Sequence, residues 1–91
     1  MLLTFAPSAA RHGISQERAA YVVEHCPAPY YAPPRAGMDD RILYLGPDRN
    51  GVPLEVGAVE RSNGELFVIH AMPLRRSFED DYAAVMRWHE R

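Results

Sequence analysis

The spacing of apolar residues changes from a helical period to a strand period and back along the chain. Residues on one side of the first segment recur at the spacing of a single helix face: Ala19, Val22, Val23 and Cys26. Ser15 precedes them and has the chemistry of an N-cap, so this segment predicts a helix over about residues 15–25. Upstream, the run PSAARHG predicts a short helical turn that ends at Gly13.

From residue 41 onward the apolar positions follow the two-residue period of a strand. Three such runs, RILYL, PLEVGAVER and ELFVIHAM, are separated by the turn-forming segments GPDRNG and SNG. We therefore expect an antiparallel meander between residues 41 and 72. Ser77 then has N-cap chemistry with Asp80 three residues later, and apolar residues follow at helical spacing, which predicts a closing helix over about residues 77–89.

This order of elements predicts a single α+β domain over residues 1–91. The expected fold has an N-terminal helix, a twisted antiparallel sheet of three to four strands, and a C-terminal helix packed on the sheet. Between the first helix and the sheet, the segment CPAPYYAPPRAG (residues 26–37) contains four prolines, which exclude a helix and disfavour a central strand. We expect it to form a long, semi-rigid connection.

The Asn63-Gly64 pair favours a two-residue type I′ turn, which fixes the register of the last hairpin. In that register the predicted core face carries Leu54, Val56, Ala58 and Glu60 beside Phe67, Ile69 and Ala71. The other face carries Glu55, Gly57, Val59 and Arg61 beside Leu66, Val68, His70 and Met72. His70 then lies opposite Gly57, and Glu55 lies on the next pair. Because glycine has no side chain, we expect a hollow above Gly57 that is lined by these two titratable side chains. A loop of three or four residues would regroup these side chains.

Composition limits the classes of function. The net charge of −2 excludes a generally positive surface, so any site for nucleic acid or another anion must be local. All ten basic residues are arginine, which suits bidentate phosphate recognition but also follows from a GC-rich genome. The single Cys26 and four scattered histidines indicate no disulfide framework, no metal and no other cofactor, and they favour a reducing compartment. Without a signal peptide or an apolar span, the expected location is cytoplasmic, with no membrane partner.

Several polar residues in the second half of the chain have both a functional and a structural interpretation. Arg75 and Arg76 follow Pro73, which ends the strand and would place both arginines at the rim of the hollow, where they contribute little to folding. Alternatively, they form solvated surface ion pairs. His70 has the chemistry of a proton carrier with Glu55 favouring its charged form, or it is a half-buried strand residue beside an exposed glutamate.

The positions of four further candidates remain open. Arg41 projects to either face of its strand. Tyr44 and Tyr82 are core or rim aromatics whose hydroxyl groups need partners, and His12 is either a local cap or a site residue.

Short motifs in a fixed order resemble the BrnT-like toxin family of the RelE superfamily. A histidine-glycine pair, His12 and Gly13, precedes the first helix, and a leucine-tyrosine strand at residues 43–47 ends in glycine-proline. A leucine-glutamate-valine strand follows at residues 54–56. An isoleucine-histidine-alanine-methionine strand at residues 69–72 is then followed by an arginine and a tyrosine. The arginine is Arg75 or Arg76, the tyrosine is Tyr82, and the resemblance covers most of the chain between Arg11 and Tyr82.

The resemblance implies the toxin of a type II toxin-antitoxin system, an endoribonuclease (RNA interferase) that cleaves mRNA either free or on the ribosome. Such toxins need no metal, because the RNA 2′-hydroxyl attacks the adjacent phosphate and the protein supplies a base, an acid and positive charge. The implied catalytic residues are His70, Glu55, Arg75, Arg41 and Tyr82. The implied RNA-binding residues are Arg76, His12 and Tyr44.

The implied protein partner is a cognate antitoxin that covers Arg75 and His70 or displaces the C-terminal helix. Both a homodimer and a toxin-antitoxin hetero-oligomer are compatible with this implication. The alternative function is a non-catalytic protein-binding module of the same fold.

Overall fold

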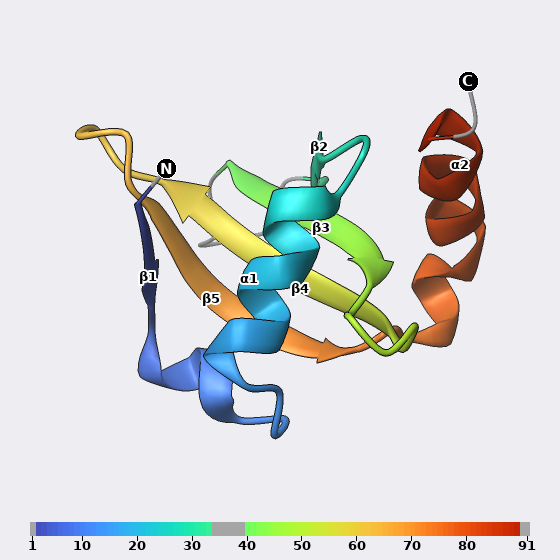
Figure 1. Cartoon of the computed structure of the whole chain (residues 1–91). Coiled ribbons are helices and arrows are strands. Elements are labelled where there is room, and N and C mark those ends of the chain that lie inside the picture. The colour runs from blue at the N-terminus through green and yellow to red at the C-terminus, as the bar shows by residue number, and fades with distance from the viewer. Residues whose placement is uncertain (1, 34–39, 90–91) are drawn as a thin grey trace.

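The computed structural model describes residues 2–33 and 40–89 and shows the predicted α+β class (Figure 1). Its elements follow the chain in this order: β1 (Leu3–Phe5), the 3-10 helix η1 (Pro7–Ala10), α1 (Gln16–His25), β2 (Tyr30–Tyr31), β3 (Arg41–Pro47), β4 (Pro53–Glu60), β5 (Leu66–Pro73), the 3-10 helix η2 (Arg76–Phe78) and α2 (Glu79–His89). Within the described residues, five strands form one sheet in the order β1-β5-β4-β3-β2. β1 is parallel to β5, and the other neighbours are antiparallel.

Two short edge strands extend the sheet beyond the three to four strands that were predicted. β1 pairs with the first residues of β5, from Leu3 opposite Leu66 to Phe5 opposite Val68. β2 lies within the proline-rich connection, where Tyr30 and Tyr31 pair with the start of β3. An edge strand tolerates nearby prolines because one of its sides needs no ladder partner. The last part of the predicted connection, residues 34–37, lies outside the described residues.

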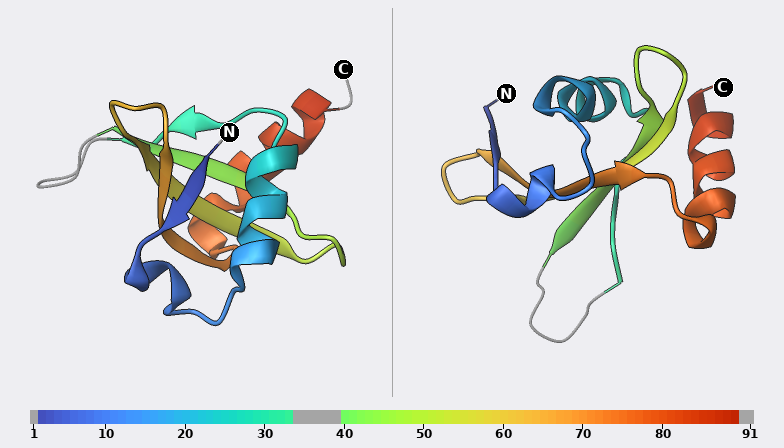
Figure 2. Two further views of the ribbon diagram at one scale, coloured as in Figure 1. Left: turned by 60° about the vertical axis from the view of Figure 1, so that its left-hand side comes forward. Right: turned by 90° about the horizontal axis from the view of Figure 1, so that it is seen from below.

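The prediction of the first helix is confirmed, and this helix covers one face of the sheet (Figure 2). Ser15 caps it, because the Ser15 Oγ accepts a hydrogen bond of 3.1 Å from the backbone N–H of Arg18. The predicted turn before it is the 3-10 helix η1, and Gly13 follows with a positive φ of 75°. The core between α1 and the sheet includes Val22, Val23, Tyr44, Leu54, Val56, Ala58, Leu66, Val68 and Ala71.

The β4–β5 hairpin has a longer loop than predicted. The backbone N–H of Arg61 donates to the carbonyl of Glu65 at 2.8 Å, so three residues rather than two form the loop, with Gly64 at φ 84°. A β-bulge then compensates, because Ala58 pairs with Val68 while Gly57 pairs with His70 and leaves Ile69 as the extra residue. The predicted pairing of Gly57 with His70 is therefore present, but it results from a three-residue loop and a bulge instead of a two-residue turn.

The side chains between the loop and the bulge lie on the opposite face from the one predicted. Leu66 and Val68 were expected beside Glu55, but both are buried in the core under α1. Phe67 and Ile69 were expected in that core and are only half-buried. A one-residue change in loop length moves every side chain to the other face until a bulge restores the register.

The closing helix starts later than predicted, and Ser77 is not its N-cap. Ser77 lies inside η2, which begins after Arg75 without a side-chain cap, and α2 starts at Glu79. Three acidic residues in its first turn suit the positive end of the helix dipole. α2 packs beside β3, on the opposite side of the molecule from β1 (Figures 1 and 2). Among the described helices, none is long and apolar enough to cross a membrane.

Candidate functional site

Three of the predicted site residues on the long strands lie on the sheet face that points away from α1. Leu45 pairs with Glu55, and Leu43 pairs with Gly57, which in turn pairs with His70. Because side chains alternate along a strand, this face receives Arg41 from β3, Glu55 from β4 and His70 from β5.

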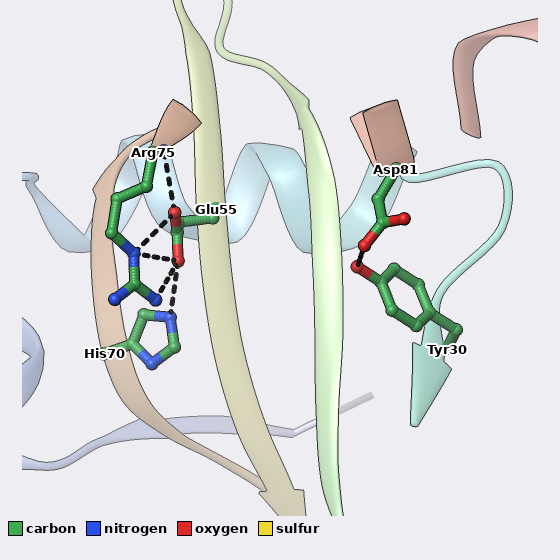
Figure 3. A network of polar contacts seen from close by, with 5 residues as sticks. All are labelled: Tyr30, Glu55, His70, Arg75 and Asp81. Carbon is green, nitrogen blue, oxygen red and sulfur yellow. Dashed lines mark hydrogen bonds and ion pairs between the residues drawn. The ribbon is translucent and has the colours of Figure 1, made fainter. Parts of the chain in front are cut away.

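Glu55 is completely buried and is held by Arg75 (Figure 3). Its Oε1 accepts hydrogen bonds from the backbone N–H of Arg75 at 2.9 Å and from Nε at 3.1 Å. Its Oε2 accepts from Nη2 at 2.7 Å. This bidentate ion pair ties the segment after β5 back onto β4, although 46% of the Arg75 side chain is exposed.

His70 fills the space above Gly57 where a hollow was predicted. A Cβ atom built on Gly57 would lie 2.5 Å from the ring carbon Cε1 and 2.7 Å from Nδ1. The other ring nitrogen, Nε2, is 3.4 Å from the Oε2 of Glu55, and it is buried without a hydrogen bond of good geometry. Since 17% of the His70 side chain is exposed, the ring connects the buried carboxylate with solvent.

The environment of Glu55 keeps it ionised. Burial alone would raise the pKa of this carboxyl group, but the contacts with His70 and Arg75 outweigh burial and lower the pKa to about 2. A carboxylate with so low a pKa is a poor proton acceptor, and its burial prevents contact with a substrate. The prediction of Glu55 as a base is therefore not supported, nor is the alternative of an exposed strand residue. Its role is to hold Arg75 and to face His70.

Arg41 and Arg75 meet at a cavity of about 260 Å³ that lies beside this cluster rather than above Gly57. The described residues that line the cavity are Pro33, Arg41, Arg75, Ser77 and Phe78. The Nε of Arg41 is buried and has no hydrogen-bond partner. The structure thus brings together four of the predicted residues: Glu55, His70 and Arg75 in direct contact, and Arg41, which lines the same cavity as Arg75.

The other predicted residues lie apart from the cluster. Tyr82 is half-buried in α2, where burial raises its pKa, and no polar contact between described residues joins it to the cluster. His12 is exposed in the turn before α1. Tyr44, which the resemblance implied as an RNA-binding residue, is only 7% exposed and belongs to the core under α1. Arg76 is exposed next to Arg75.

Sequence reasoning missed three residues of the cavity and one buried charge. Ser77 was interpreted as a helix cap, and neither Phe78 nor Pro33 carries a chemical signal for a site. The buried charge is Asp48, which accepts hydrogen bonds from the backbone of Val52 and Asn50 and from Arg18. These bonds, with that from Val52 the largest cause, lower the pKa of Asp48. The turn segment GPDRNG gave the available signal, since aspartate often caps a turn in this way.

Comparisons of the chain with models of known protein families, with curated proteins and with solved structures find no match. In the part of the chain that the structure describes, no group of three or more histidine, cysteine, aspartate or glutamate side chains is arranged to hold a metal ion.

The close contact between Gly57 and His70 generates a prediction about stability. Gly57→Ala should lower the free energy of unfolding by about 2 kcal/mol, because the new methyl group overlaps the imidazole ring. Gly46→Ala is the matched control on the neighbouring strand, since its Cβ would meet only Val22 Cγ1 at 3.8 Å. Chemical denaturation measures both. Equal losses in the two variants would contradict the overlap, and adding His70→Ala to Gly57→Ala should recover part of the loss.

From the Glu55–Arg75 ion pair we predict that Arg75 contributes to the free energy of unfolding. The sequence alone had indicated little contribution from this residue. Arg75→Ala leaves Glu55 buried without its main partner and should cost about 3 kcal/mol of the free energy of unfolding. The double variant Glu55→Met/Arg75→Met removes both charges at similar volume and should recover most of the loss. Arg76→Ala, the same change at the exposed neighbour, should have little effect. Similar destabilisation by Arg75→Ala and Arg76→Ala in urea titrations would refute this assignment.

The lowered pKa of Glu55 predicts sensitivity to acid. Its value is about 2 in the folded protein against an ordinary value of 4.5, so the unfolded chain binds more protons between these values. The stability that Glu55 contributes is therefore fully present above about pH 4.5 and is lost as the pH falls toward 2. Asp48 acts in the same direction. We expect urea titrations to show a shallower acid dependence in Glu55→Met/Arg75→Met, and an unchanged dependence would exclude Glu55 as a cause.

Proposed function

We propose that this protein is a metal-independent endoribonuclease of the toxin type, neutralised by a cognate antitoxin. The observation that carries the proposal is the contact of His70 with the Glu55–Arg75 ion pair, next to a cavity that Arg41 also lines. A proton carrier and positive charge then lie in one region, and these are the groups that cleavage of RNA by its own 2′-hydroxyl requires.

Each residue of the cluster has a distinct role in the proposed reaction. The 2′-oxygen of RNA attacks the adjacent phosphorus, the bond to the 5′-oxygen breaks, and the products carry a 2′,3′-cyclic phosphate and a 5′-hydroxyl. His70 moves a proton at its exposed side, either from the 2′-hydroxyl or to the leaving oxygen. Arg75 and Arg41 stabilise the negative charge that develops on the phosphate. Glu55 does not touch RNA but holds Arg75 in place.

The family resemblance supports the same proposal. The histidine-glycine motif directly precedes α1, the leucine-tyrosine motif lies on β3, the leucine-glutamate-valine motif on β4, and the isoleucine-histidine-alanine-methionine motif on β5. Tyr82, the tyrosine of the resemblance, lies apart from the cluster on α2, so the second proton transfer of the proposed reaction is made with water. An antitoxin with an acidic segment would complement the exposed Arg75 and Arg76.

One observation favours the second candidate, a binding module without catalysis. The Glu55–Arg75 pair anchors η2 and α2 to the sheet, and this structural role accounts for the buried carboxylate without any substrate. In that case α2 and the cavity beside it serve a protein partner alone.

A cleavage assay separates the two candidates. Purified protein with end-labelled single-stranded RNA and EDTA should yield 2′,3′-cyclic phosphate ends, and a substrate with 2′-deoxyribose should remain intact. His70→Gln should lower the rate at least about 100-fold, the usual range for loss of an acid-base group, without a matching change in the melting temperature. His25→Gln, which alters an exposed histidine on α1, should keep the wild-type rate.

The same variants test the proposed activity in bacterial cells. Induction of the wild-type chain should arrest bacterial growth, and His70→Gln should relieve the arrest while His25→Gln does not. RNA that stays intact both free and on ribosomes, with folded protein present, would reject the endoribonuclease and leave the binding module.

A further inference from the structure

Arg41 stands out because its side chain is partly buried and has no ion-pair partner in the part of the chain that the structure describes. Its Nε is inaccessible to solvent and makes no hydrogen bond, and no ion pair to Arg41 forms within residues 2–33 and 40–89. A buried donor on a charged group costs free energy unless something accepts its hydrogen bond. Arg41 also lines the cavity of about 260 Å³, so an anion in this cavity would lie beside the residue.

Arg75, which also lines this cavity, is paired with Glu55. Its backbone N–H, Nε and Nη2 donate to the carboxylate, whereas the second terminal nitrogen points away from Glu55 (Figure 3). Since Glu55 neutralises Arg75, Arg41 is the lining residue whose charge has no partner among the described residues. An entering anion would thus find the guanidinium of Arg41, one nitrogen of Arg75 and the hydroxyl of Ser77.

Two of the described residues that line the cavity are apolar. Phe78 and Pro33 line it, and the guanidinium carbon of Arg75 lies 5.3 Å from the centre of the Phe78 ring. The volume is about nine times that of one water molecule in the liquid, so it has room for more than a bare phosphate. An aromatic ring beside arginine donors is a combination that binds nucleotides, by stacking and by charge.

We infer that this cavity binds the phosphate of a nucleotide, with Arg41 as the main ligand, Arg75 as a positioning residue held by Glu55, and the ribose or base against Phe78. The assignment of the anion as a nucleotide phosphate rests on the proposed function. The assignment of Arg41 as the ligand rests on the geometry alone.

Two probes test the inference by NMR titration of the full chain: inorganic phosphate and a 2′-deoxy dinucleotide, which the proposed reaction cannot cleave. Both should shift the amide signals of Arg41, Arg75 and Ser77, and the dinucleotide should bind more tightly. Arg41→Gln should weaken both about tenfold, the usual effect of losing a charged hydrogen bond. Arg49→Gln, the same charge change at an exposed residue that packs on Tyr21, is the matched control.

A separate variant, Phe78→Leu, tests the contribution of the apolar side chains that line the cavity. Phe78→Leu should weaken the dinucleotide but leave the affinity for phosphate unchanged. Equal affinities for the two probes in the wild-type chain would overturn the nucleotide assignment, because stacking would then contribute nothing. Equal weakening by Arg41→Gln and Arg49→Gln, or shifts that map elsewhere, would overturn the site.

Failure of this inference is distinguishable from failure of the proposed function. A chain that cleaves RNA in a His70-dependent manner but binds neither probe through Arg41 refutes the cavity and keeps the endoribonuclease. A chain that binds both probes through Arg41 but leaves RNA intact supports the cavity and refutes catalysis. The melting temperature of Arg41→Gln should match the wild type, since the Glu55–Arg75 pair remains in place.

Discussion

An ionised carboxylate with no exposure to solvent needs compensating charge or hydrogen-bond donors, and in this fold Arg75 supplies both to Glu55. Because Glu55 is on β4 and Arg75 follows β5, their pairing determines where the chain leaves the sheet. That exit in turn sets the position of η2, and with it the Ser77 and Phe78 side chains that face Arg41. The arrangement of the whole candidate site therefore follows from one buried charge.

The absence of a side chain at Gly57 is the second condition for the site. The imidazole of His70 lies in the space that any other residue at position 57 would occupy, and this position brings Nε2 toward Glu55. The pairing of Gly57 with His70 depends in turn on the bulge at Ile69. Backbone irregularity and side-chain chemistry are thus linked here, since a regular hairpin with this loop would place His70 opposite a different residue.

Local signals in the sequence were sufficient for the main elements. Ser15 and the helical spacing after it specified α1, and the turn segments separated β3, β4 and β5, because caps, turns and periodicity act over a few residues. The parallel pairing of β1 with β5 joins segments more than sixty residues apart, which no local pattern encodes. The burial of Glu55 was equally hidden, since alternation along a strand does not reveal whether the second face is covered. The sequence prediction missed both the third loop residue and the bulge at Ile69. These two errors cancel at His70, which pairs with Gly57 as predicted. They do not cancel at Leu66 or Val68, which lie on the opposite face from the one predicted.

The shortness of β1 and β2 has a consequence for how other molecules can approach. These strands form the two borders of the sheet with three and two residues, and η1 lies against the stretch of β5 beyond β1, where the Ser8 Oγ donates to the carbonyl of Ile69 at 2.7 Å. Few backbone groups are left for an incoming strand to continue the hydrogen-bonded ladder. A binding partner would therefore have to contact side chains instead of adding a strand to the sheet. For the same reason, edge-to-edge pairing of sheets from different molecules is disfavoured.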